Sequence, residues 1–303
     1  MKKLCIWSAA TVCLTLISNS APLSAAVLYS DPLNDASADV LVLTGADTAA
    51  TFVDYSNFTV GSTSFQIAEA PNSVGGTATR GLLLQANIAG GAGAAVNVLL
   101  GSTPTSFSGD YRLSYDVYMN STVSVGGSGT TEQTLWGIGV DNNATLEAAI
   151  NRNGGNTVGT WGWLTSENGS GTEDSAINLN GTELADIGDT DNAASAALFN
   201  SAFTNLYGTP NATAAGQWIS VEVESLNGNV SVKYNGVEFF NEASAGTTGF
   251  AMFGYEDRFG SIATPGDNSW GLYDNIVVTA VPEPSSGLAL LSIGGFALLR
   301  RRR

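Results

Sequence analysis

The chain has 303 residues, enough for one large β domain or two small ones. It contains no histidine, and its two cysteines, Cys5 and Cys13, lie in an N-terminal segment that is expected to be removed. This composition excludes Ser-His-Asp and Cys-His catalytic machinery and every His/Cys site for zinc, haem or iron–sulfur clusters. Hydrophobic residues make up 44% of the chain and charged residues 13%, which supports a packed core rather than disorder.

The first 26 residues have the three parts of a secretory signal peptide. A basic start at Lys2 and Lys3 is followed by an apolar run over 4–17 and a tail of small residues. The sequence therefore predicts cleavage by signal peptidase after Ala26. The alternative is an N-terminal membrane anchor, but the apolar run is shorter than the roughly 20 residues that a spanning helix needs.

The C-terminus also has three parts. An extended Pro-Glu-Pro motif is followed by the apolar segment Gly287–Leu299 and a terminal cluster of basic residues. A helix that rises about 1.5 Å per residue is too short, over this segment, to cross a hydrocarbon core of about 30 Å. The arginines favour the cytoplasmic face, so the segment predicts a weak, temporary anchor, with a simple single-pass anchor as the alternative. The residues are Pro282, Glu283 and Pro284 in the motif and Arg300, Arg301, Arg302 and Arg303 in the cluster.

This tail, from Val281 to Arg303, resembles the PEP-CTERM sorting signal. The resemblance implies recognition by an exosortase, a membrane-embedded cysteine protease-transpeptidase of bacteria with an outer membrane, in systems that commonly produce exopolysaccharide. Exosortase and signal peptidase are therefore the expected processing partners. The protein is expected to contact the membrane only through this segment and to end at the cell surface or in the extracellular matrix.

The body of the chain is strongly acidic. Residues 27–281 carry five basic and 26 acidic side chains, a net charge of −21. Nucleic acid is excluded as a partner, because its binding needs clustered Lys and Arg, and an anionic membrane surface is disfavoured for the same reason. Calcium and neutral glycans remain compatible, while acidity that only keeps an exported protein in solution is the simpler explanation.

Alternating apolar and polar residues predict β-strands throughout the body. The clearest examples are Tyr111–Tyr118 and Ile219–Glu224, and Asn235-Gly236 is typical of a hairpin turn. Helical periodicity is confined to Ala193–Phe203, a short helix or turn. Further strands are predicted at Leu82–Asn87, Ala95–Leu99, Leu135–Val140, Val230–Tyr234, Val237–Phe240, Gly249–Tyr255 and Gly271–Thr279.

Short strands separated by Gly, Asn and Ser turns predict an all-β fold, a two-sheet antiparallel β-sandwich. The domain organisation is then a signal peptide at 1–26, a sandwich at 27–280 and a sorting segment at 281–303 with a short apolar helix. The order of several segments resembles the concanavalin A-like lectin/glucanase (LamG-type) jelly roll, a fold that hosts lectins, adhesive modules and glycosidases. Those segments are Gly109–Val117, Gln217–Val223, Tyr234–Gly236, Phe253–Asp257 and Leu272–Val278.

No catalytic residues are predicted. A glycosidase needs two facing carboxylates, and the Glu-x-Asp-x-(x)-Glu pattern of glucanases with this fold is absent. The nearest candidates, Glu222 and Glu224, alternate with apolar residues and should lie on the solvated face of their strand. An enzyme would gain support only if these two side chains pointed into a concave groove beside another acid.

Two acidic clusters are candidate sites for a structural Ca²⁺, the only cofactor considered. Asp189 and Asp191 share one loop, and Asp31 and Asp274 could meet if the first and last strands pair. The resemblance adds that an acid near the final strand of a jelly roll can ligate calcium. The alternative, favoured here, is that these residues form Asx turns and caps.

Trp161 and Trp163 are candidate sugar-stacking residues. They would share one face of an extended segment rich in Gly, Ser and Asn, although tryptophan in a sandwich is usually buried. Trp136, Trp218 and Trp270 are expected in the core or at strand edges. Together the patterns favour a non-catalytic, exported surface or matrix protein that binds exopolysaccharide. A secreted polysaccharide-degrading enzyme and a structural adhesin without a ligand are the alternatives.

Overall fold

The computed structural model of the chain describes ten stretches of residues. They are 25–73, 79–120, 131–141, 158–166, 174–189, 191–208, 210–244, 246–260, 262 and 269–282. The predicted leader, the apolar segment Gly287–Leu299 and the four terminal arginines lie outside these stretches, apart from the last two leader residues. Within Val27–Val281 the chain forms one compact unit, and its regular elements in the described residues are strands and one short helix.

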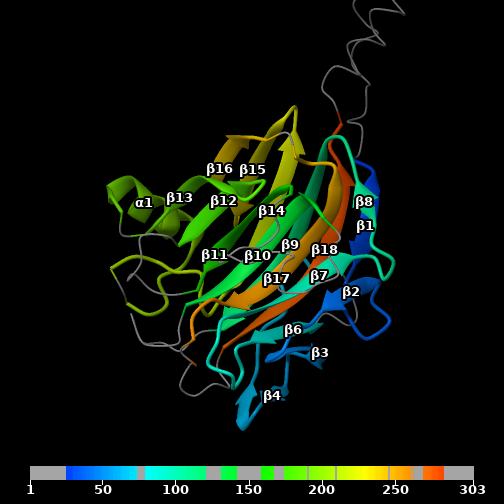
Figure 1. The fold of residues 1–303 in the computed structure, drawn as a ribbon. Helices are drawn as coiled ribbons and strands as arrows, with labels where there is room; N and C mark the ends of the chain where they lie inside the picture. Colours follow the sequence, from blue (N-terminus) through cyan, green and yellow to red (C-terminus); the bar gives the residue numbers. More distant parts are fainter. Residues whose placement is uncertain are drawn as a thin grey trace, which may run out of the picture. The chain divides into compact units, whose positions relative to one another are not determined.

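The first sheet has eight antiparallel strands in the order β16-β15-β14-β9-β18-β6-β3, with β1 also paired to β18 (Figure 1). Val27 of β1 lies opposite Thr279 of β18, so the first and last strands are neighbours. The strands of this sheet are Val27–Asp31 (β1), Thr48–Asp54 (β3), Arg80–Ala86 (β6), Tyr111–Asn120 (β9), Trp218–Leu226 (β14), Asn229–Tyr234 (β15), Val237–Ala243 (β16) and Trp270–Ala280 (β18).

The second sheet also has eight strands, in the order β13-β12-β11-β10-β17-β7-β2, with β8 paired to β17. A separate two-stranded hairpin is formed by Phe58–Val60 (β4) and Thr63–Phe65 (β5). The strands of the second sheet are Val40–Leu43 (β2), Ala94–Leu100 (β7), Ser106–Phe107 (β8), Glu132–Val140 (β10), Thr160–Thr165 (β11), Ser175–Leu179 (β12), Thr182–Ile187 (β13) and Gly249–Asp257 (β17).

The core lies between the two sheets and follows from the alternation of side chains along the strands. In β14, every second residue is buried, and the others are only partly buried. Aromatic rings join the layers: the ring of Tyr115 in β9 lies 5.7 Å from that of Phe253 in β17, and Phe253 lies 5.0 Å from Tyr273 in β18. The predicted all-β, two-sheet antiparallel sandwich is confirmed.

A second cluster of aromatic residues lies on the outer face of the first sheet. The ring of Phe58 in β4 lies 5.2 Å from that of Trp270, and Tyr118 lies 5.8 Å from Trp218. The indole Nε1 of Trp218 donates a hydrogen bond of 2.7 Å to the carbonyl of Ala68. The segment that contains the β4–β5 hairpin therefore covers one end of this face through apolar packing.

The short helix α1 spans Ala193–Ala202, where a helix or turn is predicted. Asn192 caps it, because its side-chain oxygen accepts hydrogen bonds from the backbone amides of Ala194 and Ser195. Phe199 anchors the helix to β16, its ring lying 5.2 Å from that of Phe239. Among the residues that the structure describes, no helix is both long and apolar enough to cross a membrane.

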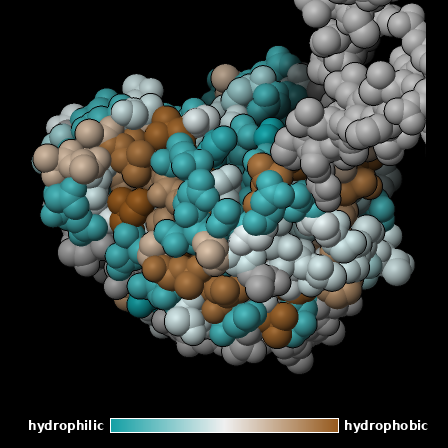
Figure 2. Space-filling view, turned by 90° about the horizontal axis from the view of Figure 1, so that it is seen from above, coloured by the Kyte–Doolittle hydropathy of each residue, from teal (hydrophilic) through white to brown (hydrophobic). Residues whose placement is uncertain are grey.

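The surface mixes polar and apolar residues. Figure 2 shows hydrophobic patches interleaved with hydrophilic ones on the face that it presents. Apolar side chains scattered singly over a folded domain are ordinary. The large exposed ones among the described residues are Val27, Leu28, Ile88, Val158, Leu184, Leu206 and Phe259.

Two carboxyl groups lie buried side by side in the interior, Glu132 of β10 opposite Asp257 of β17. Glu132 accepts hydrogen bonds from Ser166 Oγ (3.0 Å) and Ser269 Oγ (2.6 Å). Burial, which disfavours the charged form, raises the pKa of Glu132 to about 8 and that of Asp257 to about 6. Folding therefore favours the protonated form of both groups.

The consequence is a fold that weakens as pH rises. Between pH 6 and 8 the folded chain retains a proton on Glu132 that the unfolded chain has released, so the free energy of unfolding falls by up to about 1.4 kcal/mol per pH unit. Urea unfolding at several pH values measures this slope, and Glu132→Gln should flatten it. Glu183→Gln, an exposed change on β13, should leave it unaltered. A slope that survives Glu132→Gln would contradict the assignment.

Candidate functional site

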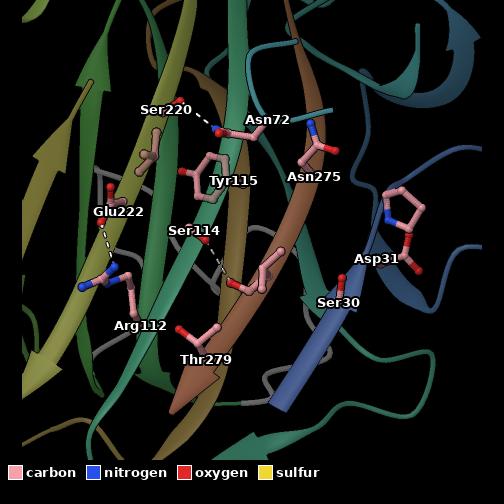
Figure 3. Close-up of a pocket in the computed structure, with 13 residues that line it drawn as sticks. Ser30, Asp31, Asn72, Arg112, Ser114, Tyr115, Ser220, Glu222, Asn275 and Thr279 are labelled. Carbon is pink, nitrogen blue, oxygen red and sulfur yellow. Dashed lines mark hydrogen bonds and ion pairs between the residues drawn. The ribbon is translucent and has the colours of Figure 1, made fainter. Parts of the chain in front are cut away.

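A groove runs over the open part of the outer face of the first sheet (Figure 3). Its cavity volume is about 600 Å³, within the range of roughly 300–1,000 Å³ that is usual for ligand sites. Residues of β1, β9, β14 and β18 form the floor, and Asn72 closes one end. The lining residues are Ser30, Asp31, Pro32, Asn72, Arg112, Ser114, Tyr115, Ser220, Val221, Glu222, Asn275, Val277 and Thr279.

The polar floor follows from the same alternation of side chains along the strands that forms the core. In β9, Leu113 and Tyr115 point into the sandwich, so Arg112 and Ser114 lie on the outer face. Strand pairing sets Ser114 opposite Glu222 of β14, and places hydroxyl, amide and charged groups in adjacent rows. No single strand could supply this lining.

Arg112 joins two glutamates at one end of the groove. Its Nε donates a 2.9 Å hydrogen bond to Glu224 Oε2, Nη2 contacts the same oxygen, and Nη1 lies 3.3 Å from Glu222 Oε2. The two glutamates do lie on the face opposite the apolar layer, as predicted. They are partly buried and paired with arginine rather than freely solvated, with side-chain exposures of 33% for Glu222 and 16% for Glu224.

A hydrogen-bond network around Asp116 and Asp274 fixes the other end of the groove. The two carboxylates are register partners on β9 and β18. Asp116 accepts from Asn72 (backbone N at 3.0 Å, Nδ2 at 2.7 Å), from Ser220 Oγ at 2.8 Å and from Asn275 Nδ2 at 3.0 Å. These bonds hold Asn72, and with it the end wall, against the sheet.

Asp274 extends the same network toward the aromatic cluster. It accepts hydrogen bonds from Tyr55 OH (2.8 Å), Ser73 Oγ (3.2 Å) and the backbone amide of Asn275 (2.7 Å). Burial, above all, raises the pKa of Asp274 to about 6. Asp116 and Asn72 were not predicted from the sequence, because nothing in their local sequence distinguishes a buried, hydrogen-bonded polar side chain from a solvated one.

The predicted calcium ligands do not assemble in the described part of the chain. The terminal strands do pair, but Asp31 lies opposite Ile276 and accepts from the amides of Leu33 (2.7 Å) and Asp39 (2.6 Å). Asp274 is engaged in its own network. Of the described residues, no group of three or more His, Cys, Asp or Glu could hold a metal ion.

The second predicted cluster, Asp189 and Asp191, is also hydrogen-bonded within the protein. Asp191 Oδ2 accepts a 2.6 Å hydrogen bond from the amide of Gly188, and the amide of Asp189 donates one of 2.6 Å to Asp174 Oδ2. The first bond is local, whereas the second spans 15 residues and uses the backbone of Asp189 rather than its carboxylate. A structural Ca²⁺ at either cluster stays a prediction.

Trp161 and Trp163 lie on β11, and their side chains share a face, with ring centroids 6.0 Å apart. The exposed platform that the sequence suggested is not present, because the two residues are only 4% and 2% exposed. They belong to an apolar cluster with Leu135 and Met252 on the face of the second sheet that points away from the central core. The expectation that they offer open stacking surfaces is corrected accordingly.

The other three tryptophans of the body lie where they are predicted, in buried positions or at the edge of a cluster. Trp136 and Trp270 are fully buried, and Trp218 packs at the edge of the covered aromatic cluster. The buried pair Glu132 and Asp257 has separated pKa values, a feature of some acid–base sites, but neither residue lines the groove.

Beyond the folded unit, residues 280–303 match a family described as the PEP-CTERM protein-sorting motif. The tail is a PEP-CTERM motif. The chain therefore carries a signal for export and exosortase processing, and the PEP-CTERM resemblance is confirmed. The match covers the tail alone and leaves the activity of the folded unit open.

No curated protein matches the sequence. Among solved structures, similarity is found to the carbohydrate-binding module CBM66 from Bacillus subtilis (TM-score 0.37, 11% identity, 66% of this chain and 86% of that one). The carbohydrate recognition domain of Emp47p gives a TM-score of 0.44 at 9% identity, over 87% of this chain and 100% of the other. The alginate lyase AlgAT5 gives 0.35 at 12% identity, over 84% and 94%. These likenesses are too weak to assign a function.

Removing the Asp116 carboxylate should loosen the end wall of the groove. Asp116→Ala removes the carboxylate that accepts from Asn72, Ser220 and Asn275, and we expect it to lower the free energy of unfolding by about 2–4 kcal/mol. Urea unfolding measures this loss. Asp186→Ala, an exposed change on β13, should cost less than about 0.5 kcal/mol. Equal losses in the two variants would show that the network contributes nothing.

Proposed function

We propose that this protein is exported by a bacterium with an outer membrane, processed by signal peptidase and exosortase, and retained at the cell surface or in the matrix as a non-catalytic polysaccharide-binding protein. The PEP-CTERM tail supports the route. The groove on the first sheet supports the binding activity, and the hydroxyl, amide and charged side chains among its lining residues are the observation on which the proposal depends.

The chemistry of the lining suits a sugar chain. Polysaccharides present hydroxyl groups that need both donors and acceptors, which Ser, Thr and Asn side chains supply together. Ser30, Ser114 and Thr279 offer hydroxyls along the floor, and Asn275, whose Nδ2 is bonded to Asp116, offers its side-chain oxygen. These groups come from β1, β9 and β18, so they are spread across the width of the floor (Figure 3).

The carboxylates in the groove favour binding over hydrolysis. A glycosidase places one acid on each side of the scissile bond. Glu222 and Glu224 instead lie on one strand and share the guanidinium of Arg112. Asp31 uses both carboxylate oxygens to accept backbone amides. Glu224 and Asp31 are therefore already occupied in holding the groove together.

Filling the groove should abolish binding. Ser114→Trp places a large ring on the floor, and we expect the protein to lose retention on its producer's own exopolysaccharide. Thr182→Trp makes the same change on an exposed edge strand of the other sheet and should bind normally. Pull-down with the purified polysaccharide measures both, and melting temperatures verify folding.

Two results would count against this function. Equal retention of wild type and Ser114→Trp would place binding elsewhere. Release of new reducing ends from the polysaccharide by the wild-type protein would show that the groove is catalytic after all.

Processing can be tested on the exported protein itself. Intact mass spectrometry should show the loss of residues 1–26 and of the terminal arginines, with any added group appearing as extra mass. Replacing Pro282, Glu283 and Pro284 by alanine should leave the arginines attached and the protein in the membrane fraction. Full-length wild-type protein recovered from the cytosol, leader included, would contradict the proposed route.

A further inference from the structure

The groove has an excess of negative charge. Its lining includes the carboxylates of Asp31 and Glu222 and a single cation, Arg112. Glu224 adds another negative charge next to the cavity. Three charges of one sign against one of the other would repel an anionic ligand and attract a cationic one.

Arg112 is a poor candidate for holding an acidic sugar. A guanidinium recognises a carboxylate through paired N–H groups, and the Nε, Nη1 and Nη2 of Arg112 are all turned to the two glutamates. A uronic acid would have to compete with Glu222 and Glu224 for this guanidinium and would be repelled by both carboxylates.

Glu222 is the group with acceptor capacity to spare. It meets Arg112 through Oε2 at 3.3 Å, a longer contact than the bond that Glu224 makes. Its side chain is about one third exposed and points into the groove (Figure 3). A carboxylate offers about four lone-pair sites, so Glu222 can accept further hydrogen bonds from a ligand.

On the proposed function, that the groove binds a polysaccharide, we infer that its ligand carries protonated amino groups, and that Glu222 is the residue that selects for them. An ammonium group on a sugar ring would donate charge-assisted hydrogen bonds to Glu222 while neighbouring ring hydroxyls meet Ser114 and Ser220. The net charge of the body, −21 over residues 27–281, strengthens the attraction at long range.

Three oligosaccharides of equal length separate the alternatives: a glucosamine hexamer, an N-acetylglucosamine hexamer and a galacturonate hexamer. In mildly acidic buffer they are cationic, neutral and anionic. Calorimetry with the exported protein should rank their affinities in that order, with the cationic chain bound at least roughly tenfold more tightly than the neutral one.

Paired variants distinguish recognition in the groove from attraction by the whole acidic body. Glu222→Gln should lower the affinity for the glucosamine hexamer roughly tenfold and leave the affinity for the N-acetylglucosamine hexamer unchanged. Glu183→Gln removes the same charge from the exposed edge strand of the other sheet and should alter neither. Melting temperatures within a few degrees of wild type verify that both variants are folded.

Each remaining outcome overturns the inference in a recognisable way. Equal affinity for the charged and acetylated hexamers would refute selection of amino groups and leave polysaccharide binding intact. Equal losses of affinity for the glucosamine hexamer in Glu222→Gln and Glu183→Gln would show that only the net charge of the protein matters. No binding of any hexamer, together with no retention on the producer's exopolysaccharide, would remove the proposed function as well.

Discussion

The alternation of side chains across the first sheet is the constraint on which the groove depends. Leu113 and Val221 are held in the core, so Arg112 and Glu222 must emerge on the opposite face. A slip of one residue in either strand would exchange the two sets and bury the charges. The register of β9 and β14 is therefore fixed by the core, and the chemistry of the floor is fixed with it.

The shape of the groove has a different origin. Its end wall comes from a segment distant in sequence, held down by packing around Trp270 and Trp218 and by the hydrogen bonds to Asp116 and Asp274. A wall that is bonded before the ligand arrives loses little conformational freedom on binding. The acidic side chains in this region accept hydrogen bonds from protein donors, which keeps the wall in place.

The elements that could be predicted from the sequence are those defined by residues close together in the chain. The strands with clear alternation, β9 and β14 among them, and the Asn235-Gly236 turn depend on neighbouring residues alone. By contrast, β11 falls in a stretch rich in Gly, Ser and Asn, for which no strand was predicted. A Cβ on its Gly162 would lie 2.1 Å from the carbonyl oxygen of Ala176 and 2.5 Å from the Trp136 ring, so this glycine marks tight packing rather than a loop.

The groove itself could not be foreseen. Asn72 meets Asp116 across 44 residues, and Asn275 meets it across 159, so their convergence depends on strand order that no local pattern encodes. Eight strands escaped prediction, β2, β3, β4, β5, β8, β11, β12 and β13. Several of them lie at sheet edges or in the small hairpin, where half-solvated positions blur the alternation.

The place of β18 in the first sheet has a mechanical consequence. This strand is bonded to β9, β6 and β1, and its C-terminal end continues directly into the sorting tail. If the mature protein is tethered through that end while a polymer pulls on the groove, the load runs along the strand. The hydrogen bonds that join β18 to β9 and β1 would then be loaded in shear. Many bonds would resist the force together, instead of breaking one after another.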